Sequence, residues 1–167
     1  MDKQIKIGFG GGCHWCTEAV FQSLKGVYKV DQGYIASDGT NHSFSEAVIV
    51  YFNPLEITLK SLIEIHLYTH KSTSKHSMRD KYRSAVYSFS NKQQRDSKDI
   101  IDKLQKEFNN QVITRVIPFL EFKASREAIQ NYYQKHSDKA FCRNYINPKL
   151  EVLIQKFSES VIQVKFN

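Results

Sequence analysis

Hydrophobic and polar positions along the chain follow two different periods, which predicts strands and helices that alternate. Apolar residues alternate with polar ones, or run continuously, in five segments that predict strands: 6–9, 27–34, 45–54, 82–89 and 111–122. They recur every three or four residues in five segments that predict helices: 13–26, 57–70, 90–110, 125–136 and 148–157. This order predicts an α/β (α+β) fold, a mixed β-sheet sandwich flanked by helices. Because the chain has no repeat, linker or low-complexity tract, residues 1–167 are expected to form a single domain.

The turn between the first strand and the first helix is rich in glycine. All seven glycines lie within the first 39 residues, and Gly10 to Gly12 come directly before Cys13. Glycine lets the chain turn sharply and lets a substrate approach the backbone without meeting a Cβ atom. A cysteine at a helix start lies near unpaired N–H groups that favour an anion, and only the thiolate form attacks. Cys13 is therefore the candidate nucleophile.

A second cysteine, Cys16, follows one helical turn later on the same face. A disulfide between the two closes a very small loop and should be easily reduced. The count of three cysteines argues against a disulfide scaffold. A thioredoxin-like dithiol–disulfide oxidoreductase has such a pair, with a Trp before the motif, whereas Trp15 lies inside it. A zinc site would add Cys142 and a histidine, but no second closely spaced cysteine pair is present.

The charge and hydropathy of the chain indicate which partners and which location to expect. The chain carries a net charge of +7, but its basic residues are spread along it, so we expect no nucleic-acid partner. No apolar run reaches the length of roughly 18 to 20 residues that a membrane span requires, so no membrane partner is expected. The first ten residues are too polar for a signal peptide, which predicts a cytoplasmic protein.

The segment Gly11 to Glu18, GGCHWCTE, resembles the G-G-C-F-W-C-x-E signature of the methionine sulfoxide reductase A (MsrA) family. Further motifs resemble those of the family in the same order: Gly26-Val27 with Gly33-Tyr34, Glu46-Ala47-Val48 with Asn53-Pro54, Tyr82 to Tyr87, Phe141-Cys142, and Pro148-Lys149. The resemblance covers about residues 5–155 and leaves 156–167 as a C-terminal extension.

The resemblance implies a peptide-methionine (S)-S-oxide reductase and assigns roles to individual residues. The Cys13 thiolate would attack the sulfoxide sulfur. Glu46 would be the general acid that protonates the departing oxygen, and Tyr82 would hydrogen-bond the same oxygen. Trp15 would form an apolar wall for the S-methyl group, in a substrate-binding pocket with His14 and Gly12.

The resemblance also implies how the reduced form of the enzyme is regenerated after each turnover. Cys13 is left as a sulfenic acid, which Cys16 would resolve as a disulfide, with Cys142 as the second choice. A thioredoxin-like protein, or dithiothreitol in the test tube, would then reduce the disulfide. No cofactor and no metal are expected. The substrate would be methionine sulfoxide, in peptides or free.

Several positions at the substrate rim depart from the family pattern. His14 replaces a phenylalanine, and Phe44 stands in place of a histidine. Ser77 takes the place of an aspartate, and 128–130 takes the place of Y-H-Q. The loop before Glu46 also lacks the N-P-x-Y element. We therefore expect an altered activity or substrate preference, with a zinc-binding or sulfoxide-binding module without turnover as the non-enzymatic alternative.

Overall fold

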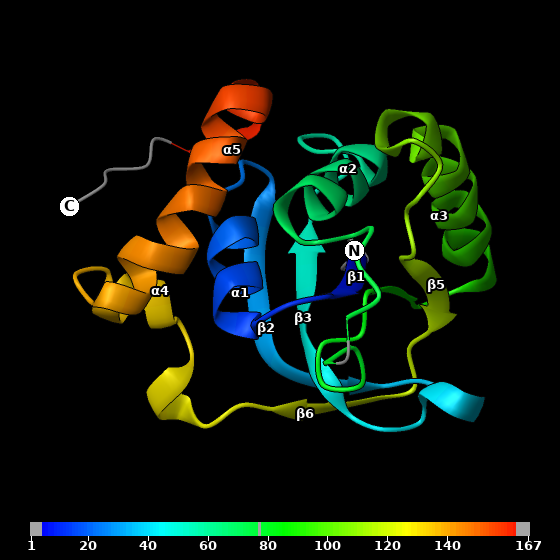
Figure 1. Cartoon of the computed structure of the whole chain (residues 1–167), viewed down its shortest axis with the longest axis horizontal. Helices are drawn as coiled ribbons and strands as arrows, with labels where there is room; N and C mark the ends of the chain where they lie inside the picture. The colour runs from blue at the N-terminus through cyan, green and yellow to red at the C-terminus, as the bar shows by residue number, and fades with distance from the viewer. Residues whose placement is uncertain (1–4, 77, 163–167) are drawn as a thin grey trace.

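The computed structural model describes residues 5–76 and 78–162, which form one sheet covered by helices (Figure 1). The strands are β1 (Ile5–Gly10), β2 (Val27–Ala36), β3 (Ser45–Phe52), β4 (Ala85–Ser88), β5 (Arg115–Pro118) and β6 (Glu121–Ala124). The α-helices are α1 (His14–Gln22), α2 (Leu59–Thr69), α3 (Asn91–Leu104), α4 (Tyr132–His136) and α5 (Asn147–Phe157). The strand order is β5-β4-β1-β3-β2-β6, in which only β4 and β5 pair in parallel. The predicted α/β class and mixed sheet are confirmed.

Strand β3 lies at the centre of the sheet and is buried on both faces. Because successive side chains point to opposite faces of a strand, Val48 and Val50 join the core beneath the helices. Ala47 and Ile49 join a second apolar cluster on the other face. Glu46 therefore shares the helix-covered face with Val48, which is where α1 begins.

The sheet is strongly curled. Its outermost strands β5 and β6 would lie about 24 Å apart in a flat sheet, five spacings of about 4.8 Å. Only Phe119 and Leu120 separate them in sequence, and three Cα steps reach at most about 11 Å. The Leu120 N–H donates to the Ala36 carbonyl, and the Ser37 hydroxyl donates to the Pro118 carbonyl. The two edges of the sheet thus approach each other at this connection.

Helices α1, α2 and α5 pack together on one face of the sheet (Figure 1). Fully buried rings join the layers, as where Phe9 of β1 stacks on Phe21 of α1 with centroids 4.6 Å apart. Beyond α5, Val161 pairs with Leu24, which follows α1. This packing fixes the start of α1 against β1 and β3.

Two predicted elements are wrong in extent. The segment 111–122 is not one strand, because β5 pairs with β4 only over Arg115–Pro118 and the chain then crosses to β6 at the opposite edge. The segment 125–136 is not one helix. It forms a short 3-10 turn at Glu127–Ile129, and α4 starts only at Tyr132, where the Glu18 carboxylate accepts the N–H groups of Asn131 and Tyr132.

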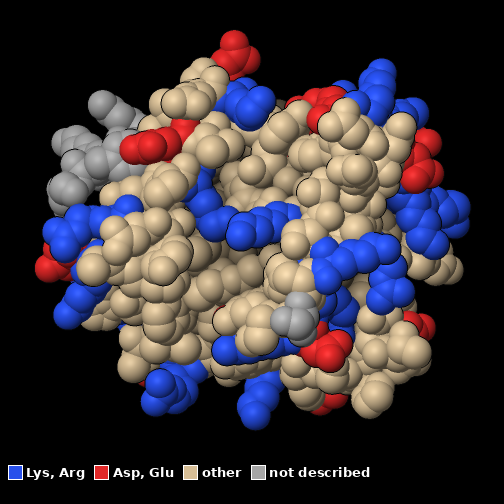
Figure 2. All heavy atoms as spheres, viewed as in Figure 1, with Lys and Arg blue, Asp and Glu red and all other residues tan. Residues whose placement is uncertain are grey.

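The remaining predictions differ from the structure mainly at their ends. Strand β4 starts at Ala85 rather than at residue 82, because the preceding backbone turns to meet β3, where Arg83 N–H donates to the Ser45 hydroxyl. Within the described ranges, no helix is both long enough and apolar enough to cross a membrane. On the face seen in Figure 2, Lys and Arg groups are dispersed and do not form one continuous stripe.

Candidate active site

The glycine turn brings Cys13 to the start of α1, where it is the N-cap residue. Gly11 has a φ of +148°, and a Cβ atom there would lie 2.5 Å from the His70 ring. A Cβ atom on Gly10 would lie 2.9 Å from the Arg83 carbonyl oxygen. Nothing lies within 4 Å of the corresponding position at Gly12. Two of the three glycines are thus required by packing within the protein, and Gly12 leaves open space next to Cys13.

Cys13 and Cys16 form a hydrogen-bonded pair of unequal acidity. The Cys16 thiol donates to Cys13, and this bond is the main reason why the pKa of Cys13 lies below its ordinary value. Burial opposes this effect, while backbone N–H groups of Trp15 and Cys16 support it. The same hydrogen bond and burial raise the pKa of Cys16. Cys13 is half-buried and Cys16 is buried, so Cys13 is both the more acidic and the more accessible thiol of the pair.

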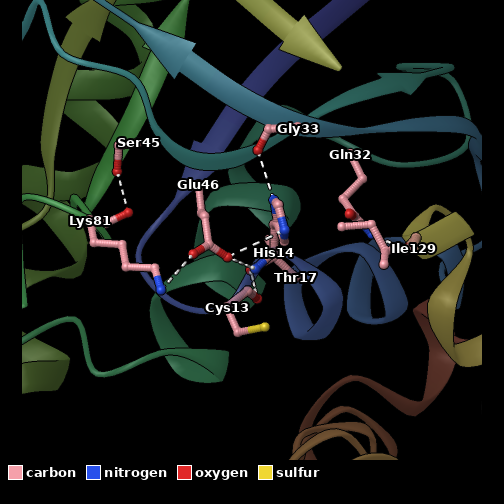
Figure 3. A network of polar contacts seen from close by, with 9 residues as sticks. All are labelled: Cys13, His14, Thr17, Gln32, Gly33, Ser45, Glu46, Lys81 and Ile129. Carbon is pink, nitrogen blue, oxygen red and sulfur yellow. Dashed lines mark hydrogen bonds and ion pairs between the residues drawn. The ribbon is translucent and has the colours of Figure 1, made fainter. Parts of the chain in front are cut away.

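Glu46 lies beside the Cys13 thiol, as the second residue of β3 (Figure 3). It is only 7% exposed, although a glutamate in a strand usually faces solvent. Its Oε1 accepts the backbone N–H of His14 at 3.3 Å, and its Oε2 lies 3.7 Å from Lys81 Nζ. The charge of Glu46 acts to raise the pKa of Cys13, which indicates that the carboxyl faces the thiol.

His14 is buried behind the Glu46 carboxyl (Figure 3). Its Nδ1 lies 2.8 Å from the Gly33 carbonyl oxygen, and its Nε2 lies 3.3 Å from Glu46 Oε1. Burial is the main reason why the pKa of His14 lies below its ordinary value. The ring also lies edge-on to Tyr34, with centroids 5.2 Å apart. His14 is therefore a neighbour of the carboxyl on β3.

Tyr82 lies just before β4 and is half-buried. The ammonium of Lys81 lies 5.1 Å from the Tyr82 ring centre, and a hydrogen bond with Tyr82 raises the pKa of Lys81. Lys81 therefore joins Tyr82 to Glu46. Sequence reasoning missed Lys81. The signal that could have revealed it is its position directly before Tyr82, where the family motif Q-Y-R-S has a glutamine.

Aromatic rings cover the other side of the first turn of α1. Trp15 stacks on Tyr132 of α4 with centroids 4.1 Å apart and meets Phe141 edge-on at 5.2 Å. Cys13, Tyr132 and Phe141 all pack against the edge of the main core, and the charge of Cys13 acts on the pKa of Tyr132. Trp15 is thus held by the C-terminal third of the chain, through a ring that lies near Cys13.

Lys149 of α5 is a second residue that sequence reasoning did not assign a role. Its Nζ donates to the Thr69 carbonyl at the end of α2, and burial lowers its pKa. The positive charge of Lys149 acts to lower the pKa of Cys16. Cys142, fully buried on the π-helical turn Cys142–Ile146, acts to raise it. Both residues belong to the C-terminal motifs, which was the available signal.

His66 on α2 and His70, the residue that follows α2, support the glycine turn. His66 Nε2 donates to the Gly10 carbonyl at 2.8 Å, and His70 Nε2 lies 2.8 Å from the Ser84 hydroxyl. Burial lowers the pKa of both rings, that of His70 to about 3. Within residues 5–76 and 78–162, no group of three or more His, Cys, Asp or Glu side chains is placed to hold a metal ion.

Comparison with known proteins agrees with this arrangement. The family model for peptide methionine sulfoxide reductase matches residues 5–161. The chain belongs to this family. It is 32% identical to the MsrA of Deinococcus radiodurans, over 92% of this chain and 82% of that protein. It is 30% identical to the MsrA of Sulfolobus acidocaldarius, over 90% of this chain and 93% of that protein.

Solved structures of the family have the same fold. Reduced Mxr1 from Saccharomyces cerevisiae is 25% identical and gives a TM-score of 0.72 over 86% of this chain and 91% of that one. Mxr1 in complex with Trx2 is 23% identical and gives a TM-score of 0.63 over 78% of this chain and 85% of that one. The predicted family and the oxidoreductase class of this MsrA-family chain are confirmed.

The departures from the family pattern are spread over several segments of the chain. Phe44 is exposed just before β3. Ile129 ends the 3-10 turn Glu127–Ile129, and its carbonyl accepts the Gln32 side-chain amide at 3.0 Å (Figure 3). Ser77 lies outside the described residues. His14 and Lys81 thus occupy the surroundings of Glu46 in this MsrA-family member.

Proposed function

We propose that this protein reduces methionine S-sulfoxide to methionine by attack of the Cys13 thiolate. The observation that carries the proposal is the placement of Cys13. Its thiol has a lowered pKa and lies close to the Glu46 carboxyl and to Tyr132, the ring on which Trp15 stacks. A sulfoxide has an electrophilic sulfur, a basic oxygen and a methyl group, and the site offers one complementary group to each.

In the first step, the Cys13 sulfur forms a bond to the sulfoxide sulfur while the sulfoxide oxygen takes a proton from Glu46. The S–O bond of the substrate and the new sulfur–sulfur bond then break as the hydroxyl is transferred to the Cys13 sulfur. Methionine departs with its sulfur reduced by two electrons, and Cys13 becomes the sulfenic acid. General acid catalysis of this kind contributes about 10²-fold to 10⁴-fold. Tyr82, joined to Glu46 through Lys81, would hydrogen-bond the same oxygen.

In the second step, the Cys16 thiol attacks the sulfenic acid and releases water, which leaves a Cys13–Cys16 disulfide. The hydrogen bond between the two sulfur atoms supports this choice. Cys142 is the alternative resolving residue, and it lies near enough to Cys16 to affect its pKa. A dithiol reductant then restores both thiols. The solved complex of Mxr1 with Trx2 supports a thioredoxin as that reductant.

The test is product analysis with each sulfoxide epimer. We would incubate the reduced protein with methionine S-sulfoxide or R-sulfoxide and dithiothreitol, and measure methionine by chromatography. We expect methionine from the S epimer only, and none from a Cys13→Ser variant. Equal product from wild type and from this variant would refute the proposal. Mass spectrometry of the oxidised protein and of the Cys16→Ser and Cys142→Ser variants then identifies the resolving thiol.

The hydrogen-bonded Cys13–Cys16 dithiol also suits exchange with protein disulfides, which is the second candidate function. That function predicts reduction of insulin disulfides that needs both cysteines. A Cys16→Ser variant distinguishes the two functions, because it should still give one equivalent of methionine per Cys13 in a single turnover. Loss of that single turnover together with insulin reduction by wild type would favour disulfide exchange.

A further inference from the structure

The side chain of His14 is committed to two partners, and their chemistry fixes its protons. Nδ1 lies 2.8 Å from the Gly33 carbonyl oxygen. A carbonyl oxygen can only accept, so Nδ1 carries a proton and donates it. In the neutral ring, Nε2 is then an unprotonated acceptor, and it faces Glu46 Oε1 at 3.3 Å.

This arrangement leaves room for one proton between Nε2 and Oε1. Oε1 also accepts the backbone N–H of His14, but a carboxylate facing an unprotonated Nε2 would place two lone pairs against each other in a buried site. A proton on the carboxyl makes a neutral pair, and a proton on Nε2 makes an ion pair. In either form the two residues together hold one proton more than the carboxylate and the neutral ring.

We propose that His14 is a positioning residue that keeps Glu46 supplied with the proton that the sulfoxide oxygen takes. This proposal deepens the proposed function and rests on it. The proton is held between His14 Nε2 and Glu46 Oε1, next to Cys13. The phenylalanine that the family motif has at this position could favour a protonated carboxyl only by excluding water. In this chain the imidazole of His14 shares the proton directly.

The charged and titratable groups that face the His14–Glu46 pair come from three places in the chain. Cys13 precedes the His14 ring at the start of α1. Lys81 lies on the loop before β4, and Tyr34 lies on β2. The Cys13 thiolate favours retention of the proton, whereas Lys81 opposes a second one. Burial lowers the pKa of His14 and acts in the same direction as Lys81, so both oppose a second proton on the pair.

The proton transfer balances within the site. The O–H bond to the Glu46 carboxyl breaks as a new O–H bond forms on the sulfoxide oxygen. The carboxylate that remains has the Lys81 ammonium 3.7 Å from Oε2. His14 stays neutral with Nδ1–H on Gly33. Solvent returns one proton to the pair before the next turnover.

The first test is the pH profile of kcat/KM for methionine S-sulfoxide, whose alkaline limb reports loss of the shared proton. His14→Asn keeps a donor for Gly33, and His14→Gln keeps an amide near Glu46, but neither side chain can hold the proton. We expect both to move the alkaline limb to lower pH by about one unit, so that each loses about tenfold more activity than wild type at alkaline pH. Lys81→Met should move the limb to higher pH.

The matched control is His42→Asn. The His42 ring bonds the Gly39 carbonyl through Nδ1 at 2.8 Å, as His14 bonds Gly33, but it is exposed and lies outside the site. We expect a wild-type profile from this variant. An alkaline limb that stays at the wild-type pH in both His14 variants would overturn the proposal.

The second test needs no activity. Ring ¹⁵N chemical shifts of the histidines, with the His14 signals assigned from the His14→Asn spectrum or from through-space contacts to Tyr34, show which nitrogen is protonated. We expect Nδ1 to be protonated and the Glu46→Gln substitution to change the titration of His14 but not that of His42. A ring protonated only at Nε2 would exclude the proposal. If wild type forms no methionine, the proposed function fails, while this measurement still decides the state of the pair.

Discussion

The two sides of the Cys13 thiol differ in how they are built. The polar side consists of His14, Glu46 and Lys81, and backbone hydrogen bonds to the sheet position it. The aromatic side consists of Trp15, Tyr132 and Phe141, two of which come from the C-terminal third of the chain and are positioned by ring packing. The polar side supplies charge and a proton, and the aromatic side supplies apolar surface. Changes to the polar side should therefore lower kcat, and changes to the aromatic side should raise KM.

The largest effect should come from Glu46→Gln on the polar side. Loss of the general acid should lower kcat/KM by about 100-fold or more. The thiol itself should remain reactive, because removal of the Glu46 charge removes an effect that raises the pKa of Cys13. The measurements are methionine formation and the rate of Cys13 alkylation by iodoacetamide. The exposed Glu121→Gln on β6 is the control and should change neither. Slower alkylation in Glu46→Gln would contradict the expectation that Glu46 supplies the proton without being needed for the reactivity of the Cys13 thiol.

The aromatic side should respond more weakly. Trp15→Ala removes the stack on Tyr132 and should raise KM about tenfold, because an aromatic contact contributes about 0.5 to 1.5 kcal/mol beyond its buried area. Trp15→Phe keeps a stacking ring and should retain most of the affinity. Steady-state kinetics measure the two parameters separately. A fall in kcat with unchanged KM would show that the two sides are not divided in this way.

A smaller effect should follow from Cys16→Ala, which removes the buried thiol that hydrogen-bonds Cys13. Because the Cys16 hydrogen bond is the largest cause of the lowered Cys13 pKa, its loss should raise that pKa. A higher pKa leaves less thiolate at pH 7, so alkylation of Cys13 should slow several-fold. The pH dependence of alkylation measures this shift. Cys142→Ala is the matched control, and we expect it to leave the profile unchanged.

The smallest effect on the chemistry should come from the histidines that support the glycine turn, although stability should change. Burial lowers the pKa of His70 to about 3, below the value of about 6.5 expected in the unfolded chain. The unfolded state therefore binds more protons between these values, and stability should fall as the pH drops from about 6.5 toward 3. Urea unfolding midpoints at pH 7 and pH 5 measure this fall in stability. His70→Gln should reduce the difference between the two midpoints. An unchanged difference in this variant would show that His70 is not its cause.

Much of the fold could be predicted from local patterns. The glycine turn before Cys13, the helix that follows it and the buried strand β3 are each determined by neighbouring residues. The division of 111–122 between the two edges could not be predicted, because it depends on the curl of the whole sheet. The start of α4 at Tyr132 likewise depends on Glu18, more than a hundred residues away.

The candidate site was predicted unevenly for the same reason. Motifs locate Cys13, Glu46 and Tyr82, because their spacing along the chain carries the signal. Lys81 and Lys149 were missed, because their importance arises only when a loop and α5 are brought to the thiols. The orientation of His14 toward Gly33 could not be inferred either, since a pattern of residue types does not specify which carbonyl a ring will meet.

The short crossing at Phe119 and Leu120 has a consequence for association between molecules. An outer strand with free backbone groups is a template for pairing with another chain. Here each outer strand is only four residues long, and the crossing ties the two together. Neither can swing outward to recruit a neighbour without displacing the other. The molecule is thereby protected from edge-to-edge aggregation by the path of its backbone.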